Sequence, residues 1–166
     1  MAERWRPAYV AIGSNLDDPL AHVRRAVFDL KHLSSDLGFR CSAAYRSAPL
    51  GPADQPEYIN AVAGFLTRHP PQVLLAALQT IEAEHGRSRD GTRWGPRTLD
   101  LDLLAVGDFE IASETLSLPH PEIEHRSFVL KPWCDVTRCF SIPGLGVVSA
   151  QRNAACGDLQ FAEALT

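Results

Sequence analysis

Apolar residues in the first third of this chain change from strand-like to helix-like spacing. The segment AYVAIGSNL (8–16) begins as a short apolar strand and breaks at Gly13-Ser14-Asn15. Asp18-Pro19 then provides a helix N-cap followed by a proline at the first helical position. Apolar residues at helical spacing follow and predict a helix that ends at about Ser34: Leu20, Val23, Val27, Leu30 and Leu33.

Two strand-like segments and a second helix follow. FRCSAAYRS (39–47) and EYINAVAGFLT (57–67) are strand-like, with a turn-rich segment between them. Pro70-Pro71 opens a second helix, and Gly86 is a suitable terminator for it. After a charged loop, a further strand begins at Leu99.

This β-α-β-β-α-β order is the ferredoxin-like arrangement. We therefore predict an α+β fold with a ferredoxin-like βαββαβ core. Beyond Gly107 the pattern predicts an additional hairpin and short helices. No repeat or linker interrupts the sequence, so residues 1–166 are expected to form a single domain.

The charge balance limits the partners that this chain can have. The formal net charge is −4, which argues against a nucleic acid or an anionic membrane as the main partner. The N-terminal segment lacks the apolar core of a signal peptide, and no apolar run reaches transmembrane length. We expect a cytoplasmic monomer that acts on small molecules, with its cysteines as reduced thiols.

The segment RWGPRTLDLDLL (93–104) places two carboxylates on one face of a strand. Asp100 and Asp102 alternate with leucines, so their Cα atoms lie about 6–7 Å apart on the same side. A solvated strand face is the default explanation for such a pair. The apolar run Leu103–Val106, however, predicts a strand buried on both faces rather than an edge strand. Carboxylates at the end of a buried strand need compensation, and Mg²⁺ would supply it.

Four arginines precede the aspartates within eleven residues: Arg87, Arg89, Arg93 and Arg97. A solvated loop would explain them. Their concentration beside two acids on an acidic protein also suits a metal–polyphosphate complex, in which aspartates hold the metal and arginines hold phosphate oxygens. No Walker-type or kinase glycine-rich loop is present. The residues alone therefore indicate Mg-nucleotide phosphoryl transfer and nothing finer.

Several segments, in order, resemble one enzyme family. These are AIGSNL (11–16), PLGPADQPEYINAV (49–62), RWGPRTLDLDLL (93–104) and LPHPEIEHRSFVLKP (118–132). Over about residues 8–135 the chain resembles the 6-hydroxymethyl-7,8-dihydropterin pyrophosphokinases of folate biosynthesis. The resemblance implies a ferredoxin-like fold. It also implies a reaction in which the pterin alcohol attacks the β-phosphorus of ATP, giving AMP and the pterin diphosphate.

The resemblance also assigns roles at the phosphate end of the site. It implies that Asp100 and Asp102 bind two Mg²⁺ ions. Such a transfer requires no obvious general base, and Asp102 is the nearest candidate for one. Arg87, Arg89 and Arg97 match arginines that bind phosphate or belong to a loop that acts in catalysis. The remaining residues expected to contact ATP are Gln79, Glu82, Trp94, His120 and Arg126. For Glu82, an ordinary polar helix face is an almost equally good explanation.

For the pterin end, the resemblance implies that Tyr58 and Phe128 stack on the flat heterocycle and that Asn60 reads its edge. Stacking stabilises a planar ring, and an amide offers both donors and an acceptor. Ser47, Ala48 and Leu50 belong to the segment whose backbone lines this pocket. Taken singly, Tyr58 and Phe128 would more often be core residues.

Two other classes of function fit parts of the sequence. A single-strand RNA-binding module would explain the fold and the aromatics, but it predicts a basic surface and an RNP-type strand motif that are not visible. A regulatory ligand-binding domain would not need two aspartates beside four arginines.

The loop from Arg87 to Trp94 is expected to close over bound Mg–ATP as a lid.

Overall fold

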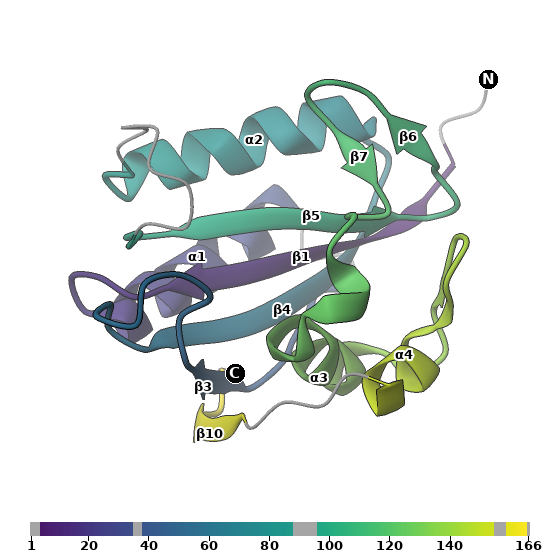
Figure 1. The fold of residues 1–166 in the computed structure, drawn as a ribbon. Coiled ribbons are helices and arrows are strands. Elements are labelled where there is room, and N and C mark those ends of the chain that lie inside the picture. The colour runs from purple at the N-terminus through teal and green to yellow at the C-terminus, as the bar shows by residue number, and fades with distance from the viewer. Residues whose placement is uncertain (1–3, 35–37, 88–95, 155–158, 166) are drawn as a thin grey trace.

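The central sheet of the computed structural model is antiparallel (Figure 1). Its strands follow the order β10 (Gln160–Glu163), β3 (Ala44–Ser47), β4 (Tyr58–Thr67), β1 (Arg6–Ser14) and β5 (Asp100–Val106), and β2 (Arg40–Cys41) also pairs with β4. The structure describes residues 4–34, 38–87, 96–154 and 159–165. Within these ranges, no helix is long and apolar enough to cross a membrane.

The two predicted helices join the strands in ferredoxin-like order. Helix α1 (Pro19–Leu33) follows β1, and helix α2 (Pro71–Glu84) connects β4 to β5. Asp18 caps α1 through a hydrogen bond from Ala21 N at 3.3 Å, and Gly86 follows α2 with a φ of 76°. The α+β fold with a βαββαβ core is confirmed, and both helix boundaries agree with the capping signals in the sequence.

Two strand predictions need correction. The expected strand 39–47 is divided into β2 and β3, because the Ser42 hydroxyl accepts a hydrogen bond from Val62 N at 2.9 Å and interrupts the regular pairing. The apolar run after Asp102 predicts an interior strand, but among the described residues β5 pairs with β1 alone and lies at the edge of the sheet. Its second half is nevertheless buried on both faces, and its Leu104 carbonyl accepts a hydrogen bond from His120 N at 2.9 Å.

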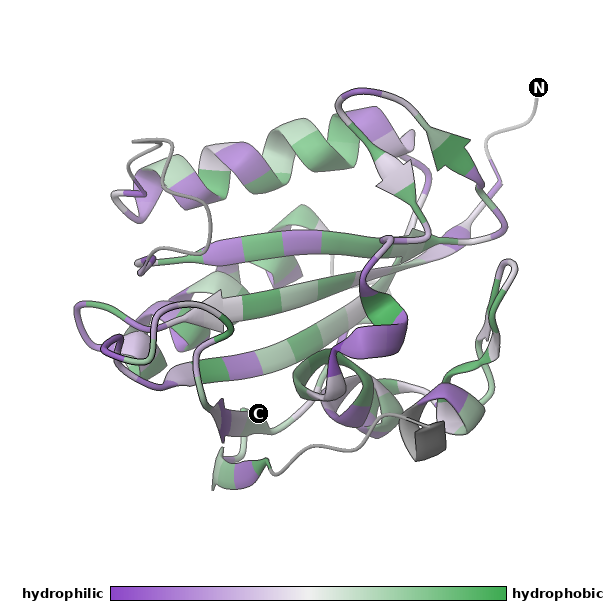
Figure 2. Ribbon diagram, viewed as in Figure 1, coloured by the Kyte–Doolittle hydropathy of each residue, from purple (hydrophilic) through white to green (hydrophobic). Residues whose placement is uncertain are grey.

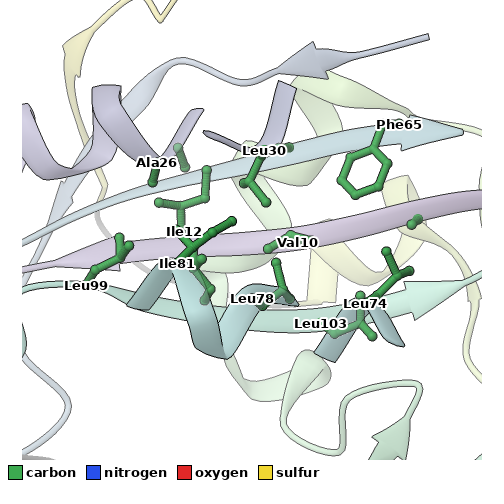
Figure 3. Packing of buried hydrophobic residues seen from close by; sticks show 14 of the residues in the cluster. Val10, Ile12, Ala26, Leu30, Phe65, Leu74, Leu78, Ile81, Leu99 and Leu103 are labelled. Atoms are coloured by element: carbon green, nitrogen blue, oxygen red, sulfur yellow. The ribbon is translucent and has the colours of Figure 1, made fainter. Parts of the chain in front are cut away.

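The core lies on both faces of the sheet. On one face, α1 and α2 pack aliphatic side chains against β1, β4 and β5, and these side chains point toward one another in Figure 3. On the other face, α3 (Ser127–Val136) covers part of the sheet and places the fully buried Trp133 against Tyr9. Alternate residues of β5 therefore face different surroundings.

The segments after β5 form short helices, as the sequence predicts, and two small hairpins where the sequence predicts one. Strands β6 (Ile111–Ala112) and β7 (Ser117–Leu118) pair with each other, and a 3-10 turn, η1 (Ile123–His125), leads into α3. A second small hairpin, β8 (Ser141–Ile142) with β9 (Gly146–Val147), and helix α4 (Val148–Ala154) follow. Strand β10 then adds to the sheet beside β3.

Candidate active site

The floor of the site is a pair of residue rows that cross three strands. In the first row, Asn60 of β4, Gly13 of β1 and Asp100 of β5 are in register. In the second row, Ala11 lies between Val62 and Asp102. Because neighbouring strands lie about 4.8 Å apart, the row places Asn60 and Asp100 roughly 10 Å from each other. The small residues of β1 leave open space between them.

A cavity of about 340 Å³ lies above this floor. The expected pterin residues all line it: Ser47, Ala48, Leu50, Tyr58, Asn60 and Phe128. So do five of the residues expected at the phosphate end: Arg97, Asp100, Asp102, His120 and Arg126. The structure thus brings together expected site residues that lie up to 81 positions apart in the chain, from Ser47 to Phe128.

Asp100 is held by two guanidiniums. Its Oδ1 lies 2.7 Å from Arg97 Nη1 and 2.9 Å from Arg87 Nη1. Burial and the neighbouring Asp102 carboxylate raise the pKa of Asp100, and the two arginines oppose that rise. The charge on this carboxylate is therefore costly in the folded protein and depends on nearby cations.

Asp102 is paired with residues from the segment before α3. Its Oδ2 accepts a hydrogen bond from Arg126 Nη1 at 3.0 Å and lies 3.7 Å from His120 Nε2. The His120 Nδ1 accepts a hydrogen bond from Glu122 N at 3.2 Å, so the neutral ring carries its proton on Nε2. Burial lowers the pKa of His120, with Asp102 opposing the change, and favours this neutral form.

The other end of the cavity is aromatic and amide-lined. Asn60 Nδ2 donates a hydrogen bond to Ser47 Oγ at 2.8 Å, which fixes the orientation of the amide. The guanidinium of Arg126 lies 5.9 Å from the ring centroid of Phe128 and so links this end to the phosphate end. Tyr58 and Phe128 are both half-buried residues of the cavity wall, and Phe128 also packs against the core cluster around Trp133.

Asn15 joins the loops around the site, a role that its position in the sequence alone does not reveal. Its Oδ1 accepts a hydrogen bond from Arg97 N at 2.8 Å, and its backbone N–H donates to Arg97 O at 3.1 Å. Its amide nitrogen donates to Pro56 O at 3.1 Å and to Gln55 Oε1 at 3.3 Å. The sequence offers one signal for this role, an asparagine directly after the break of a strand. It does not identify the partners, because these lie 40 and 82 positions away in the chain.

The two α2 residues expected at the nucleotide have different surroundings and do not line the cavity. Gln79 is exposed, whereas Glu82 is only 3% exposed, so they do not share a polar helix face. Glu82 accepts a hydrogen bond from Leu101 N at 2.7 Å and pairs with Arg87. Burial raises the pKa of Glu82, and the hydrogen bond from Leu101 opposes that rise. Glu82 therefore fixes α2 and Arg87 to β5.

Three predictions concern residues outside the described ranges: the roles of Arg89 and Trp94, and closure of the loop from Arg87 to Trp94. Of that loop, the structure describes Arg87. Its guanidinium bridges Glu82 and Asp100.

The fold and the cavity together define a class of protein. A cavity that joins paired carboxylates and arginines to an aromatic and amide-lined pocket is suited to an enzyme that transfers a phosphate-containing group to a flat acceptor. The family model of 7,8-dihydro-6-hydroxymethylpterin-pyrophosphokinase (HPPK) matches residues 9–138. The chain belongs to this family.

Named relatives agree with the family match. The chain is 42% identical over 142 residues to the 2-amino-4-hydroxy-6-hydroxymethyldihydropteridine pyrophosphokinase of Haemophilus influenzae, covering 86% of this chain and 88% of that protein. It is 44% identical over 135 residues to the Pseudomonas aeruginosa protein of the same name, covering 81% and 83%.

A solved structure confirms the fold. The crystal structure of wild-type Plasmodium falciparum HPPK-DHPS with pteroate matches 90% of this chain with a TM-score of 0.66 and 13% identity. This chain covers 42% of that longer protein. The match supports the α+β architecture alone.

Proposed function

We propose that this protein transfers the β,γ-diphosphoryl group of ATP to 6-hydroxymethyl-7,8-dihydropterin, giving AMP and the pterin diphosphate, in folate biosynthesis. Family membership supports the pyrophosphokinase activity and ATP as co-substrate. The observation that carries the assignment is the shared cavity, in which Asn60 and Asp100 occupy one row of the sheet floor. A flat acceptor bound over Asn60 would direct its hydroxymethyl group toward the aspartates.

The donor set at Asp100 and Asp102 fits Mg²⁺. Both side chains offer carboxylate oxygens, which are the hard ligands that Mg²⁺ takes together with water and phosphate. The raised pKa of Asp100, caused first by burial, supports this proposal, because a nearby cation would stabilise the ionised carboxylate. We propose that these two residues hold two Mg²⁺ ions. Bound there, the ions would supply charge neutralisation and acidify the attacking alcohol.

The arginines and His120 are proposed to bind the triphosphate. Arg97, Arg87 and Arg126 are at present paired with carboxylates, and each carries further N–H donors for phosphate oxygens. Arg97 and Arg87 would offset the charge that develops on the bridging oxygen as the β-phosphorus is attacked. Asp102 is proposed as the acceptor of the alcohol proton. The neutral His120 would donate from Nε2.

The remaining assignments follow from the family resemblance. We propose that Arg89 and Trp94 contact the nucleotide and that Gln79 reaches it from α2. For Glu82, burial and the ion pair with Arg87 support a different role, in which it holds Arg87 in place. Tyr58 and Phe128 are proposed to enclose the pterin, with Ser47, Ala48 and Leu50 along its edge. We further propose that residues 1–166 act as a single pyrophosphokinase domain, as a monomer and in the cytoplasm.

A direct assay tests the proposal. The protein is incubated with ATP, Mg²⁺ and 6-hydroxymethyl-7,8-dihydropterin, and the products are separated by chromatography. AMP and the pterin diphosphate should form in equal amounts. Formation of ADP and a pterin monophosphate would contradict β,γ-diphosphoryl transfer, and no pterin product at all would contradict the acceptor.

A further inference from the structure

A histidine pair outside the cavity connects the two helices on one face of the sheet. His22 of α1 and His85, the residue that caps α2, approach with their Nδ1 atoms 2.8 Å apart. The other ring nitrogen of His85, Nε2, lies 3.3 Å from Asp29 Oδ2, also on α1. The His85 side chain is fully buried and His22 is half-buried.

The partners of His85 determine where its proton lies. An ionised carboxylate only accepts hydrogen bonds, so His85 Nε2–H donates to Asp29. In the neutral His85 ring, Nδ1 is then an acceptor, and His22 Nδ1–H must donate to it. One proton can be added on His22 Nε2 without disturbing this bond. A second proton has to enter at His85 Nδ1. That nitrogen then becomes a donor, and because it faces the Nδ1–H donor of His22, the hydrogen bond is lost.

The location of His85 connects this bond to the candidate active site. His85 N–H donates to Ile81 O at 3.1 Å, Gly86 N–H donates to Ala83 O at 3.0 Å, and Arg87 N–H donates to Glu82 O at 3.2 Å. These bonds close the last turn of α2. Arg87, at the end of the turn, reaches Asp100 at 2.9 Å.

We propose that the His22–His85 hydrogen bond is a pH-sensitive latch between α1 and the end of α2, closed while one of the two rings is neutral and opened by the second proton. Opening frees the last turn of α2 and loosens the backbone that carries Arg87. The latch itself does not depend on the enzymatic activity, whereas its effect on turnover rests on the proposed function.

On balance, the groups around His85 also disfavour its protonation. Burial lowers the pKa of His85, Asp29 opposes the change, and Arg25 and His22 add to it. All three of these neighbouring groups lie on α1. Because the folded protein binds this proton less readily than the unfolded chain, stability is fully present above the ordinary histidine pKa and declines as pH falls toward the folded value.

A matched pair of variants tests the latch. In His22→Asn, the amide occupies the position of Nδ1 and does not titrate, and it can donate to neutral His85 or accept from protonated His85. His32→Asn is the control, because His32 is an exposed histidine on the same helix whose Nδ1 contacts Phe28 O at 2.8 Å. Denaturant unfolding of the three proteins is measured from pH 8 to pH 5 in metal-free buffer.

The wild type and His32→Asn should lose stability in parallel on acidification, and His22→Asn should lose less. Equal losses in all three proteins would overturn the proposal. Nitrogen NMR of the wild-type imidazoles adds a test without mutation. Above pH 7, His22 should carry its proton on Nδ1 and His85 on Nε2, and a His22 proton on Nε2 alone would contradict the latch.

Two further measurements separate the latch from its consequence. Amide exchange at Gly86 and Arg87, corrected for intrinsic rates, should accelerate at acidic pH in the wild type and less in His22→Asn. Turnover at pH 7.5 should be equal in both proteins, and at acidic pH it should fall further in the wild type. If exchange responds and turnover does not, the latch stands and the coupling to Arg87 is refuted.

Discussion

The two faces of strand β5 carry opposite chemistry at neighbouring positions. Leu101 and Leu103 point into the aliphatic cluster under α1 and α2, whereas Asp100 and Asp102 point to the cavity between two groups of basic side chains. Figure 2 shows the hydrophilic and hydrophobic bands that follow one another along this strand. The alternation places a packed surface and a charged one on the same seven residues.

The difference between the faces comes from what lies opposite them. On the helix face, large residues of α2 such as Leu74 and Leu78 fill the space in front of β5. On the cavity face, Gly13 and Ala11 of β1 fill little space, and the carboxylates reach an open cavity. One strand can thus support stability and chemistry separately, and substitutions on the two faces should have separable effects.

The largest effect should come from Asp100→Asn. The side chain keeps its shape but loses its charge, so metal and phosphate binding at the cavity face is impaired. We expect kcat to fall about 10²- to 10³-fold, the scale for loss of one charge-stabilising group. Because burial makes the Asp100 charge costly, the free energy of unfolding should not fall. Steady-state kinetics and denaturant unfolding measure the two quantities.

Asp108→Asn is the control for this prediction. Asp108 is an exposed aspartate whose side chain lies 3.9 Å from Arg6 Nε and outside the cavity. Its replacement should leave kcat unchanged. If Asp100→Asn retained nearly full turnover at saturating Mg²⁺, the role of the cavity face would be refuted.

Leu103→Ala should show the reverse behaviour on the helix face. Leu103 is 4% exposed, and its truncation leaves a cavity in the aliphatic cluster. We expect a loss of about 2–5 kcal/mol in the free energy of unfolding, with kcat little changed at temperatures where the variant is folded. Leu66→Ala, at an exposed position of β4, should cost about 0.5 kcal/mol. A Leu103→Ala protein that is stable but inactive would break the separation of the faces.

The helix face was the more predictable of the two from sequence. Apolar spacing and caps gave both helices with their ends, since periodicity and capping are local properties. The same reasoning predicted an interior position for β5, which is wrong. A continuous apolar run indicates that a strand is buried on both faces, but it does not indicate whether the strand is central in the sheet. Here α2 and the segment at His120 bury a strand that lies at the sheet edge.

On the cavity face, the sequence predicted which residues carry the charges but not which side chains pair with each other. The spacing of Asp100 and Asp102 showed that they share a face, but nothing local identifies Arg126 as the partner of Asp102. Glu82 illustrates the limit most clearly. Its polarity suggested a helix surface, yet its carboxylate is buried because Leu101 N and Arg87 satisfy it from two other segments.

Phe128→Ala sharpens the comparison within the cavity itself. Loss of the ring should weaken pterin binding by about 1–3 kcal/mol, the scale of base–aromatic stacking. ATP affinity should hardly change. Phe161→Ala is the control, because Phe161 is an aromatic residue of β10 that is 65% exposed and does not line the cavity. Calorimetry that showed equal losses for both ligands would indicate damage to the cavity wall instead.

The smallest effect is expected where the nucleotide would leave the cavity face. Gln79 is exposed on α2 and does not line the cavity, so any contact with ATP requires the nucleotide to extend past the edge of β5. Gln79→Ala should weaken ATP binding by about 0.5–1.5 kcal/mol, the net value of one hydrogen bond, without affecting the pterin. Gln72→Ala makes the same chemical change at an exposed position near the start of the same helix and should have no effect. ATP titrations that do not distinguish the two variants would confine the nucleotide to the cavity side of β5, and α2 would then serve the site through Glu82 and its hold on Arg87.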